Sequence, residues 1–176
     1  MKLETDRLEL RPATHEDAAL LLKLFSIPEV WRFLPPGPPF TLERAHVGIE
    51  RRMKLEAERG FSPMLAFRKD TGEFIGNAGL QVVPDTSEVE IAYHYLPSVW
   101  GRGYGTEAAV AILAHGLGPL GLSNIIAICV PANVGSWRIM EKAGMRYVGL
   151  ASYYGLEGLK KYVAERGKWS PPGRPS

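Results

Sequence analysis

The spacing of hydrophobic residues predicts alternating strands and helices in the first third of the chain. Apolar and polar residues alternate over 8–11, as they do in a half-buried strand. Apolar residues then recur at helical intervals over 15–25. A second helix is expected between Thr41, which suits the cap of a first turn, and Gly60, which suits a helix end. This part of the chain therefore predicts one strand followed by two helices.

The rest of the chain switches from alternating to helical spacing and back. Three apolar segments separated by turn residues predict an antiparallel meander, after which helices and strands alternate. The predicted strands are 64–68, 74–83, 88–96, 124–130, 146–154 and 160–164, and the predicted helices are 106–117 and 136–142. This order predicts a mixed α/β sheet.

The composition is that of an ordinary globular protein. The chain has 176 residues, of which 45% are hydrophobic, and 21 Lys and Arg against 19 Asp and Glu give a net charge of +2. So balanced a charge argues against a nucleic-acid partner. The single cysteine excludes an intramolecular disulfide, and the four histidines lack ligand spacing, so we expect no metal site.

Length and the two chain ends predict the domain organisation and the location. The N-terminus is charged and lacks the apolar core of a signal peptide, and no apolar run approaches the roughly 20 residues of a membrane span. We therefore expect a cytoplasmic protein with no membrane partner. The length favours one domain, expected over 1–169. A proline-rich tail over 170–176 is expected to be mobile.

Three glycines lie where a predicted strand passes into a predicted helix. Gly101, Gly103 and Gly105 alternate with other residues just before the helix over 106–117. The first N–H groups of a helix lack internal partners and carry a partial positive charge, and glycine lets an anion approach the backbone. Arg102 adds a cation. The spacing fits neither the Walker loop nor the dinucleotide fingerprint, so an anion site and a turn that binds nothing both stay open.

A polar pair follows the next predicted strand. Asn133 and Ser136 are three residues apart at the start of a predicted helix. They either cap that helix, which both residue types favour, or present an amide and a hydroxyl to the same cleft as the glycines.

Together, these motifs resemble the GNAT superfamily of acyl-CoA-dependent N-acetyltransferases, and more closely its Rim-type branch of ribosomal-protein N-terminal acetyltransferases. The resemblance rests on the segments 8–17, 100–108 and 133–145. It implies one acyl-CoA-binding domain with a largely antiparallel, twisted sheet and helices on both faces. It also implies a V-shaped splay between two central parallel strands, here the strands that end near Leu96 and Val130.

The resemblance further implies how acetyl-CoA, the co-substrate, would be held. The backbone at Tyr93, His94 and Tyr95 would pair with the pantetheine arm, Asn133 would hydrogen-bond that arm, and Ser136 would lie near the sulfur. The pyrophosphate would bind the backbone N–H groups of six consecutive residues: Gly101, Arg102, Gly103, Tyr104, Gly105 and Thr106.

The implied reaction needs a base for the amine and a donor for the leaving thiolate. Direct attack in a ternary complex needs no covalent enzyme intermediate, which suits a chain whose one cysteine, Cys129, falls within an apolar strand. Ser136 is the candidate donor, with helix capping as its alternative. Glu90 is the first candidate base and His94 the second, because both are expected on one face of a strand. Each is alternatively a solvated sheet residue.

The base and the acceptor stay open at this point. Rim-type relatives often carry a glutamate where this chain has Val148. We expect the acceptor side to include Trp31 and Phe33, beside the prolines of 35–39, although both are alternatively a cap on the core.

The leading expectation for the acceptor is the N-terminal α-amino group of a ribosomal or other protein. A small amine, such as a polyamine, an amino acid or an aminoglycoside, is the second. A non-catalytic acyl-CoA-binding sensor is the third, because Val148 replaces the family's glutamate. The resemblance permits a monomer or a homodimer.

Overall fold

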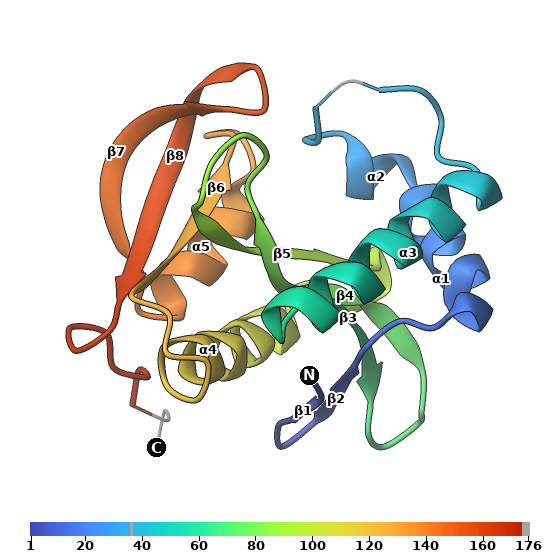
Figure 1. The fold of residues 1–176 in the computed structure, drawn as a ribbon, viewed down its shortest axis with the longest axis horizontal. Helices are drawn as coiled ribbons and strands as arrows, with labels where there is room; N and C mark the ends of the chain where they lie inside the picture. Colours follow the sequence, from blue (N-terminus) through green and yellow to red (C-terminus); the bar gives the residue numbers. More distant parts are fainter. Residues whose placement is uncertain (36, 174–176) are drawn as a thin grey trace.

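In the computed structural model, which describes residues 1–35 and 37–173, the chain forms an eight-stranded sheet with helices on both faces (Figure 1). The strand order is β1-β2-β3-β4-β5-β6-β8-β7, and β5 and β6 are the parallel pair in an otherwise antiparallel arrangement. The elements are β1 (Leu3–Glu4), β2 (Leu8–Arg11), η1 (His15–Asp17), α1 (Ala18–Phe25), α2 (Pro28–Trp31), α3 (Leu42–Arg59), β3 (Pro63–Arg68), β4 (Phe74–Val82), β5 (Val89–Tyr95), η2 (Pro97–Val99), α4 (Tyr104–Leu117), β6 (Asn124–Cys129), α5 (Val134–Lys142), β7 (Arg146–Tyr153) and β8 (Leu156–Glu165). The predicted mixed α/β fold is confirmed.

Local signals set the ends of α3, as the sequence predicts. The Oγ1 atom of Thr41 accepts a hydrogen bond from the N–H of Arg44 at 3.2 Å. Gly60 ends the helix with φ +75°, a left-handed conformation that favours glycine. The predicted meander is also confirmed as β3, β4 and β5, with boundaries that differ by one residue at most.

Several boundaries differ from the predictions for local reasons. Helix α4 begins at Tyr104 rather than at 106, because Gly103 with φ +83° already turns the chain into the helix. Helix α5 begins directly after its cap, Asn133. Strand β8 extends beyond the predicted 160–164, because it pairs with β6 on one side and β7 on the other. The short elements β1 and α2 were not predicted, since neither is long enough to show a period.

The two faces of the sheet carry separate hydrophobic clusters. Ile112 and Leu113 of α4 pack on one face with residues of β2 to β6. Ala45 and Ile49 of α3 pack on the other face with α1 and with Leu96, which follows β5. On β5, Ile91 and Tyr95 point into the first cluster, whereas the ring of His94, on the opposite face, packs against Phe25, which borders the second cluster. Strand β5 therefore contributes side chains to both halves of the molecule.

Strands β5 and β6 splay apart, as the resemblance implies. Among the described residues, β5 and β6 form one register pair, in which Glu90 lies opposite Ile126. Beyond that pair the strands run on to Tyr95 and Cys129 without pairing. The V-shaped gap therefore opens directly after Glu90.

The predicted tail lies partly outside the described residues. Of 170–176, residues 174–176 are not described, and residues 170–173 belong to no helix or strand. The domain bounds remain a prediction. Within the described part of the chain, no helix is both long enough and apolar enough to cross a membrane.

Candidate active site

The glycine-rich loop between β5 and α4 needs glycine at each of its three positions. Gly101 and Gly103 adopt φ +74° and +83°, in the left-handed region that side chains rarely adopt. A Cβ at Gly105, in the first turn of α4, would lie 2.6 Å from Cδ1 of Ile139 and would force that side chain of α5 to move. The N–H groups of the first turn of α4 have no partners within the helix and attract an anion. The loop thus has the geometry of the predicted anion site.

A buttress from the N-terminus, which the sequence did not reveal, holds this loop in place. The Nε of Arg7 donates to Oε2 of Glu107 at 2.6 Å, and its Nη1 donates to the carbonyl of Arg102 at 3.0 Å. The Arg7 guanidinium also lies 4.5 Å above the ring of Tyr104. These contacts join the start of β2 to the first turn of α4. No periodic pattern in the sequence signals a pairing across this separation.

One edge of β5 faces the gap toward β6. The N–H of Leu96 donates to the carbonyl of Ile75 at 2.9 Å, so the backbone groups of even-numbered residues face β4. His94 is among them, in register with Asn77. The backbone groups of Tyr93 and Tyr95 therefore point into the gap. The carbonyl of Tyr95 already accepts a hydrogen bond from the indole of Trp100 at 2.8 Å.

The side chains of Tyr93 and Ser136 meet across the gap between β5 and α5. The Tyr93 hydroxyl donates to the carbonyl of Ser136 at 2.9 Å, and the Ser136 hydroxyl lies 3.3 Å from the Tyr93 oxygen. Asn133 Oδ1 accepts from the N–H of Ser136 at 3.3 Å, so Asn133 caps α5. Burial raises the pKa of Tyr93, which keeps its hydroxyl protonated at neutral pH. Cys129 is buried, as expected of a core residue, and burial raises its pKa.

Glu90 is buried on the opposite face of β5. Its Oε1 accepts from Nε2 of Gln81 at 2.9 Å, and the same Gln81 nitrogen lies 3.3 Å from the Tyr154 hydroxyl. Its Oε2 has no hydrogen-bond partner among the described residues, although Glu90 is only 7% exposed. Burial raises the pKa of Glu90 above that of an ordinary carboxyl group. A buried carboxylate with a free oxygen is suited to accept a proton.

His94 lies on the same face of β5 as Glu90, four positions further along the strand. Its Nδ1 is 3.2 Å from Oδ1 of Asn77, and its ring packs edge-on against Phe25 at 5.1 Å between centroids. Burial, together with the nearby cation of Arg52, lowers the pKa of His94 to about 4. The imidazole is therefore neutral at physiological pH.

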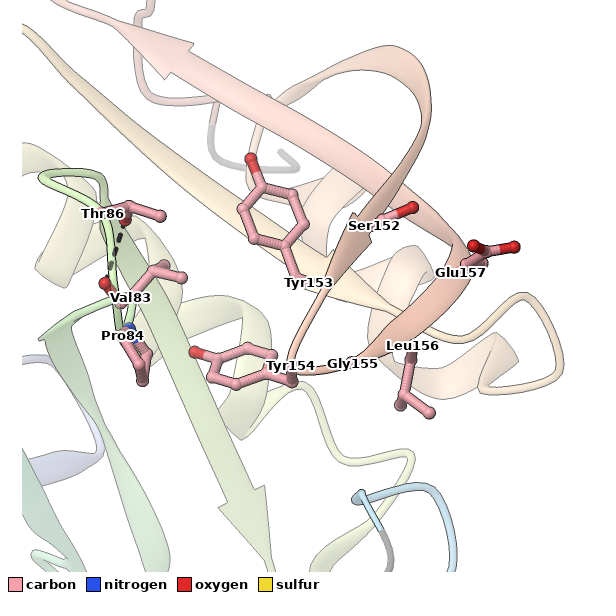
Figure 2. Close-up of a pocket in the computed structure, with 9 residues that line it drawn as sticks. All are labelled: Val83, Pro84, Thr86, Ser152, Tyr153, Tyr154, Gly155, Leu156 and Glu157. Carbon is pink, nitrogen blue, oxygen red and sulfur yellow. Dashed lines mark hydrogen bonds between the residues drawn. The ribbon is translucent and has the colours of Figure 1, made fainter.

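A pocket of about 350 Å³ lies between the β4–β5 turn and the β7–β8 hairpin (Figure 2). Figure 2 shows Tyr153 and Tyr154 projecting from the hairpin toward Val83, Pro84 and Thr86. The remaining lining residues come from the same hairpin: Ser152, Gly155, Leu156 and Glu157. The sequence did not identify this pocket, because two distant turns build it.

The predicted acceptor residues do not line this pocket. Trp31, at the end of α2, is 51% exposed, and Phe33 is half-buried with the Arg32 guanidinium 4.3 Å above its ring. Val148 lies exposed on β7, where the register with β8 shifts between Tyr147 and Gly149. Among the described residues, no three His, Cys, Asp or Glu side chains are grouped as metal ligands would be.

Comparison with known proteins assigns the family. The family profile described as an acetyltransferase (GNAT) domain matches residues 7–146. The chain belongs to the GNAT acetyltransferase family. It is therefore an acetyl-CoA-dependent N-acetyltransferase, with an amine as the acceptor, and this assignment favours a transferase over a coenzyme sensor. The glycine loop and the unpaired edge of β5 fit acetyl-CoA, since both present backbone N–H groups that have no protein partner among the described residues.

Relatives and solved structures agree with this GNAT assignment. The uncharacterized N-acetyltransferase YoaA of Bacillus subtilis is 32% identical over 153 residues, which cover 86% of each protein. The FsC-acetyl coenzyme A-N(2)-transacetylase of Aspergillus fumigatus is 30% identical and covers 99% of this chain and 80% of its own length. An acetyltransferase structure from Agrobacterium tumefaciens aligns with TM-score 0.81 and 25% identity over 94% of each chain.

The fold is also shared with the structure of RimL, a ribosomal L7/L12 α-N-protein acetyltransferase, in complex with coenzyme A. That structure aligns with TM-score 0.77 and 18% identity over 94% of this chain and 98% of its own. At this identity the likeness concerns the fold alone.

Proposed function

We propose that this GNAT enzyme acetylates the N-terminal α-amino group of a ribosomal or other protein, by direct attack of the amine in a ternary complex. One observation carries the proposal. At the vertex where β5 and β6 part, Glu90 presents a buried carboxylate with an unpaired oxygen on one face of the sheet, while the anion-binding loop lies beyond the gap. An amine and a thioester can therefore approach the same point from two sides.

The coenzyme side uses the glycine loop and the open edge of β5. The backbone N–H groups from Gly101 to Thr106 hold the pyrophosphate, with the exposed side chain of Arg102 beside them. Tyr93 and Tyr95, rather than His94, suit the pairing with the pantetheine arm, because the backbone groups of His94 face β4. Acetyl-CoA itself supplies the activated acyl group.

Two hydroxyl groups lie where they can help to stabilise the leaving thiolate. Ser136 carries its proton on a long, weak hydrogen bond of 3.3 Å to Tyr93, so this proton is available to an incoming anion. The Tyr93 hydroxyl is held by the carbonyl of Ser136 and keeps the serine side chain at the gap. Ser136 is thus the donor, and Tyr93 positions it.

Glu90 suits the role of general base better than His94. A base works best when its pKa lies near the operating pH. Burial moves the pKa of Glu90 upward, toward neutrality, whereas it moves the pKa of His94 away from neutrality, to about 4. Glu90 takes the amine proton, directly or through a water molecule, before the nitrogen attacks the thioester carbon. No other carboxylate is then needed at the position of Val148.

Exposed aromatic side chains on the acceptor side support an extended acceptor such as a peptide. Tyr154 is 38% exposed beside Glu90, and Trp31 is exposed on α2, so a peptide backbone has aromatic surface to contact. The pocket of about 350 Å³ in Figure 2 favours a second candidate, a small primary amine, because its volume is in the range of small-molecule sites.

Release of free coenzyme A thiol tests the proposal. We expect turnover with short peptides that carry a free N-terminus, and a mass increase of one acetyl group on a protein in a purified ribosomal mixture. Turnover with polyamines or amino acids but with no peptide would favour the small-amine alternative. Tight acetyl-CoA binding without turnover of any amine would overturn the proposal.

A further inference from the structure

Arg52 is a half-buried arginine whose Nη1 atom is buried and has no partner among the described residues. It lies on the inward side of α3, three residues after Ile49 and seven after Ala45, both of which are fully buried. Within the described residues, no carboxylate forms an ion pair with its guanidinium, whereas the next inward residue, Glu56, accepts a hydrogen bond from Ser62 at 2.9 Å.

This arrangement is unfavourable unless something else binds Arg52. A charge taken out of water without a partner destabilises the fold, and buried arginines are normally paired. Burial lowers the pKa of Arg52 to about 10, so the group remains charged at neutral pH. Cationic groups held without a partner in this way are typical of sites that receive an anion.

Arg52 lies on the acceptor side of the sheet. Its cation lowers the pKa of His94, so the two side chains are neighbours, and His94 shares a face of β5 with Glu90. Both Arg52 and His94 are half-buried, so solvent reaches this region. The phosphates of the coenzyme are expected at the start of α4, which packs on the opposite face. An anion bound by Arg52 would therefore not belong to acetyl-CoA.

We propose that Arg52 binds a carboxylate carried by the acceptor, a few bonds away from the amine. The inference rests on the proposed function, in which the amine approaches Glu90. A carboxylate fits because the guanidinium fork binds its two oxygens with two parallel hydrogen bonds.

Two kinds of acceptor carry a carboxylate close to the amine. One is a peptide with an acidic residue at its first or second position. The other is a free amino acid with a second carboxylate at the end of its side chain. Both supply the same group to Arg52, so the acceptor class is an amine with a nearby carboxylate, and the two sources are separated by experiment.

The test compares matched acceptors on matched variants. The peptide arm uses tetrapeptides with Glu or Gln at the second position, and the amino-acid arm uses glutamate and glutamine. For the wild-type enzyme we expect kcat/KM to favour the carboxylate member of at least one pair by about 10-fold or more. Arg52→Gln should abolish that preference by raising KM for the carboxylate acceptor, with the amide acceptor and acetyl-CoA affinity unchanged.

Arg51→Gln is the control, because Arg51 is the adjacent, exposed arginine of the same helix. Arg52→Lys keeps the charge without the fork and should restore only part of the preference. A wild-type enzyme that treats both members of both pairs alike, or an Arg52→Gln variant that keeps the preference, would overturn the assignment of Arg52.

Thermal unfolding gives a readout that does not depend on turnover. Because an unpaired buried charge is removed, Arg52→Gln should unfold at the same or a higher temperature than the wild type. The preferred carboxylate acceptor should raise the melting temperature of the wild type but not of Arg52→Gln. A large fall in melting temperature for Arg52→Gln would show a structural role and overturn the proposal. If no amine is turned over, the proposed function fails, and the melting temperatures with free glutamate and with the glutamate-containing tetrapeptide still decide whether Arg52 binds a carboxylate.

Discussion

Glu90 lies opposite Ile126 at the last register pair before β5 and β6 part. Glu90 lies on the same face of β5 as His94, whose ring contacts Phe25 of α1, while Tyr93, just beyond the pair, lies on the opposite face and contacts Ser136 of α5. The vertex of the splay thus places a proton acceptor and a proton donor on the two sides of one strand. An amine and a thioester bound on those two sides would meet without a large movement of the protein.

Replacing Glu90 by Gln should slow acetyl transfer by about 100-fold, because the base is lost while the side chain keeps its shape. In the wild type, kcat/KM should fall as the pH drops through the raised pKa of Glu90, and this limb should disappear in Glu90→Gln. Since burial disfavours the charged carboxyl group, the variant should be as stable as the wild type above neutral pH, or more so. Initial rates of thiol release between pH 6 and 9 measure this effect, with Glu58→Gln on the exposed side of α3 as the control.

Replacing Tyr154 by Phe should shift the same limb of the pH profile to higher pH. The Tyr154 hydroxyl donates toward Glu90 and so favours the charged carboxylate, which lowers the pKa that burial raises. Removing the hydroxyl raises the pKa of Glu90 further, so the base stays protonated to a higher pH. Tyr153→Phe is the matched control, because the Tyr153 hydroxyl binds Glu88 at 2.6 Å instead. An equal shift in both variants would count against a specific effect on Glu90.

Local residue types were sufficient to predict most elements. The cap at Thr41 and the end at Gly60 act within one turn of the helix they delimit, so the sequence alone predicts α3. The glycines of the loop were recognisable for the same reason, since each is required by its own backbone angle or by a close neighbour. Family resemblance added the splay, which no local signal reveals.

The parts of the site that the sequence did not predict are contacts between segments that are distant in the chain. Arg7 and Glu107 are separated by 100 positions, and nothing in either segment indicates the other. Arg52 follows Arg51 in a highly charged helix, where the sequence suggests two solvated side chains. Only the direction of α3 relative to the sheet turns one of them inward. The sequence therefore reveals the coenzyme side better than the acceptor side.

Replacing Gly103 by Val should weaken acetyl-CoA binding by about 10-fold or more, because a β-branched residue is strained at φ +83°. Its Cβ would also lie 3.3 Å from Nη2 of Arg7 and disturb the buttress. Titration calorimetry with acetyl-CoA measures the change. Gly48→Ala is the control, since Gly48 lies in α3 with open space around it and the change should slightly stabilise the helix. Wild-type affinity in Gly103→Val would remove the pyrophosphate from this loop.

Ser136→Ala and Tyr93→Phe should each reduce kcat, and their effects should not add. If Tyr93 acts by positioning Ser136, the double variant should be little slower than Ser136→Ala alone, because contacting residues share one interaction. Single-turnover rates for the two single variants and the double variant measure the coupling. Fully additive effects would indicate that the two hydroxyl groups act independently.

Replacing Asp17 by Asn should destabilise the fold near neutral pH and have little effect in strong acid. Both oxygens of Asp17 accept hydrogen bonds from Arg11 at 2.8 Å, and this pair, with bonds from Thr14, lowers the pKa of Asp17 to about 2. A lowered pKa contributes stability above the unfolded value of 3.8, and that stability is lost as the pH falls toward 2. The difference of nearly two pKa units corresponds to about 2 kcal/mol at neutral pH. Urea unfolding at pH 7 and pH 2 measures it, and Asp70→Asn, which breaks a surface pair with Arg68, should lower the free energy of unfolding much less.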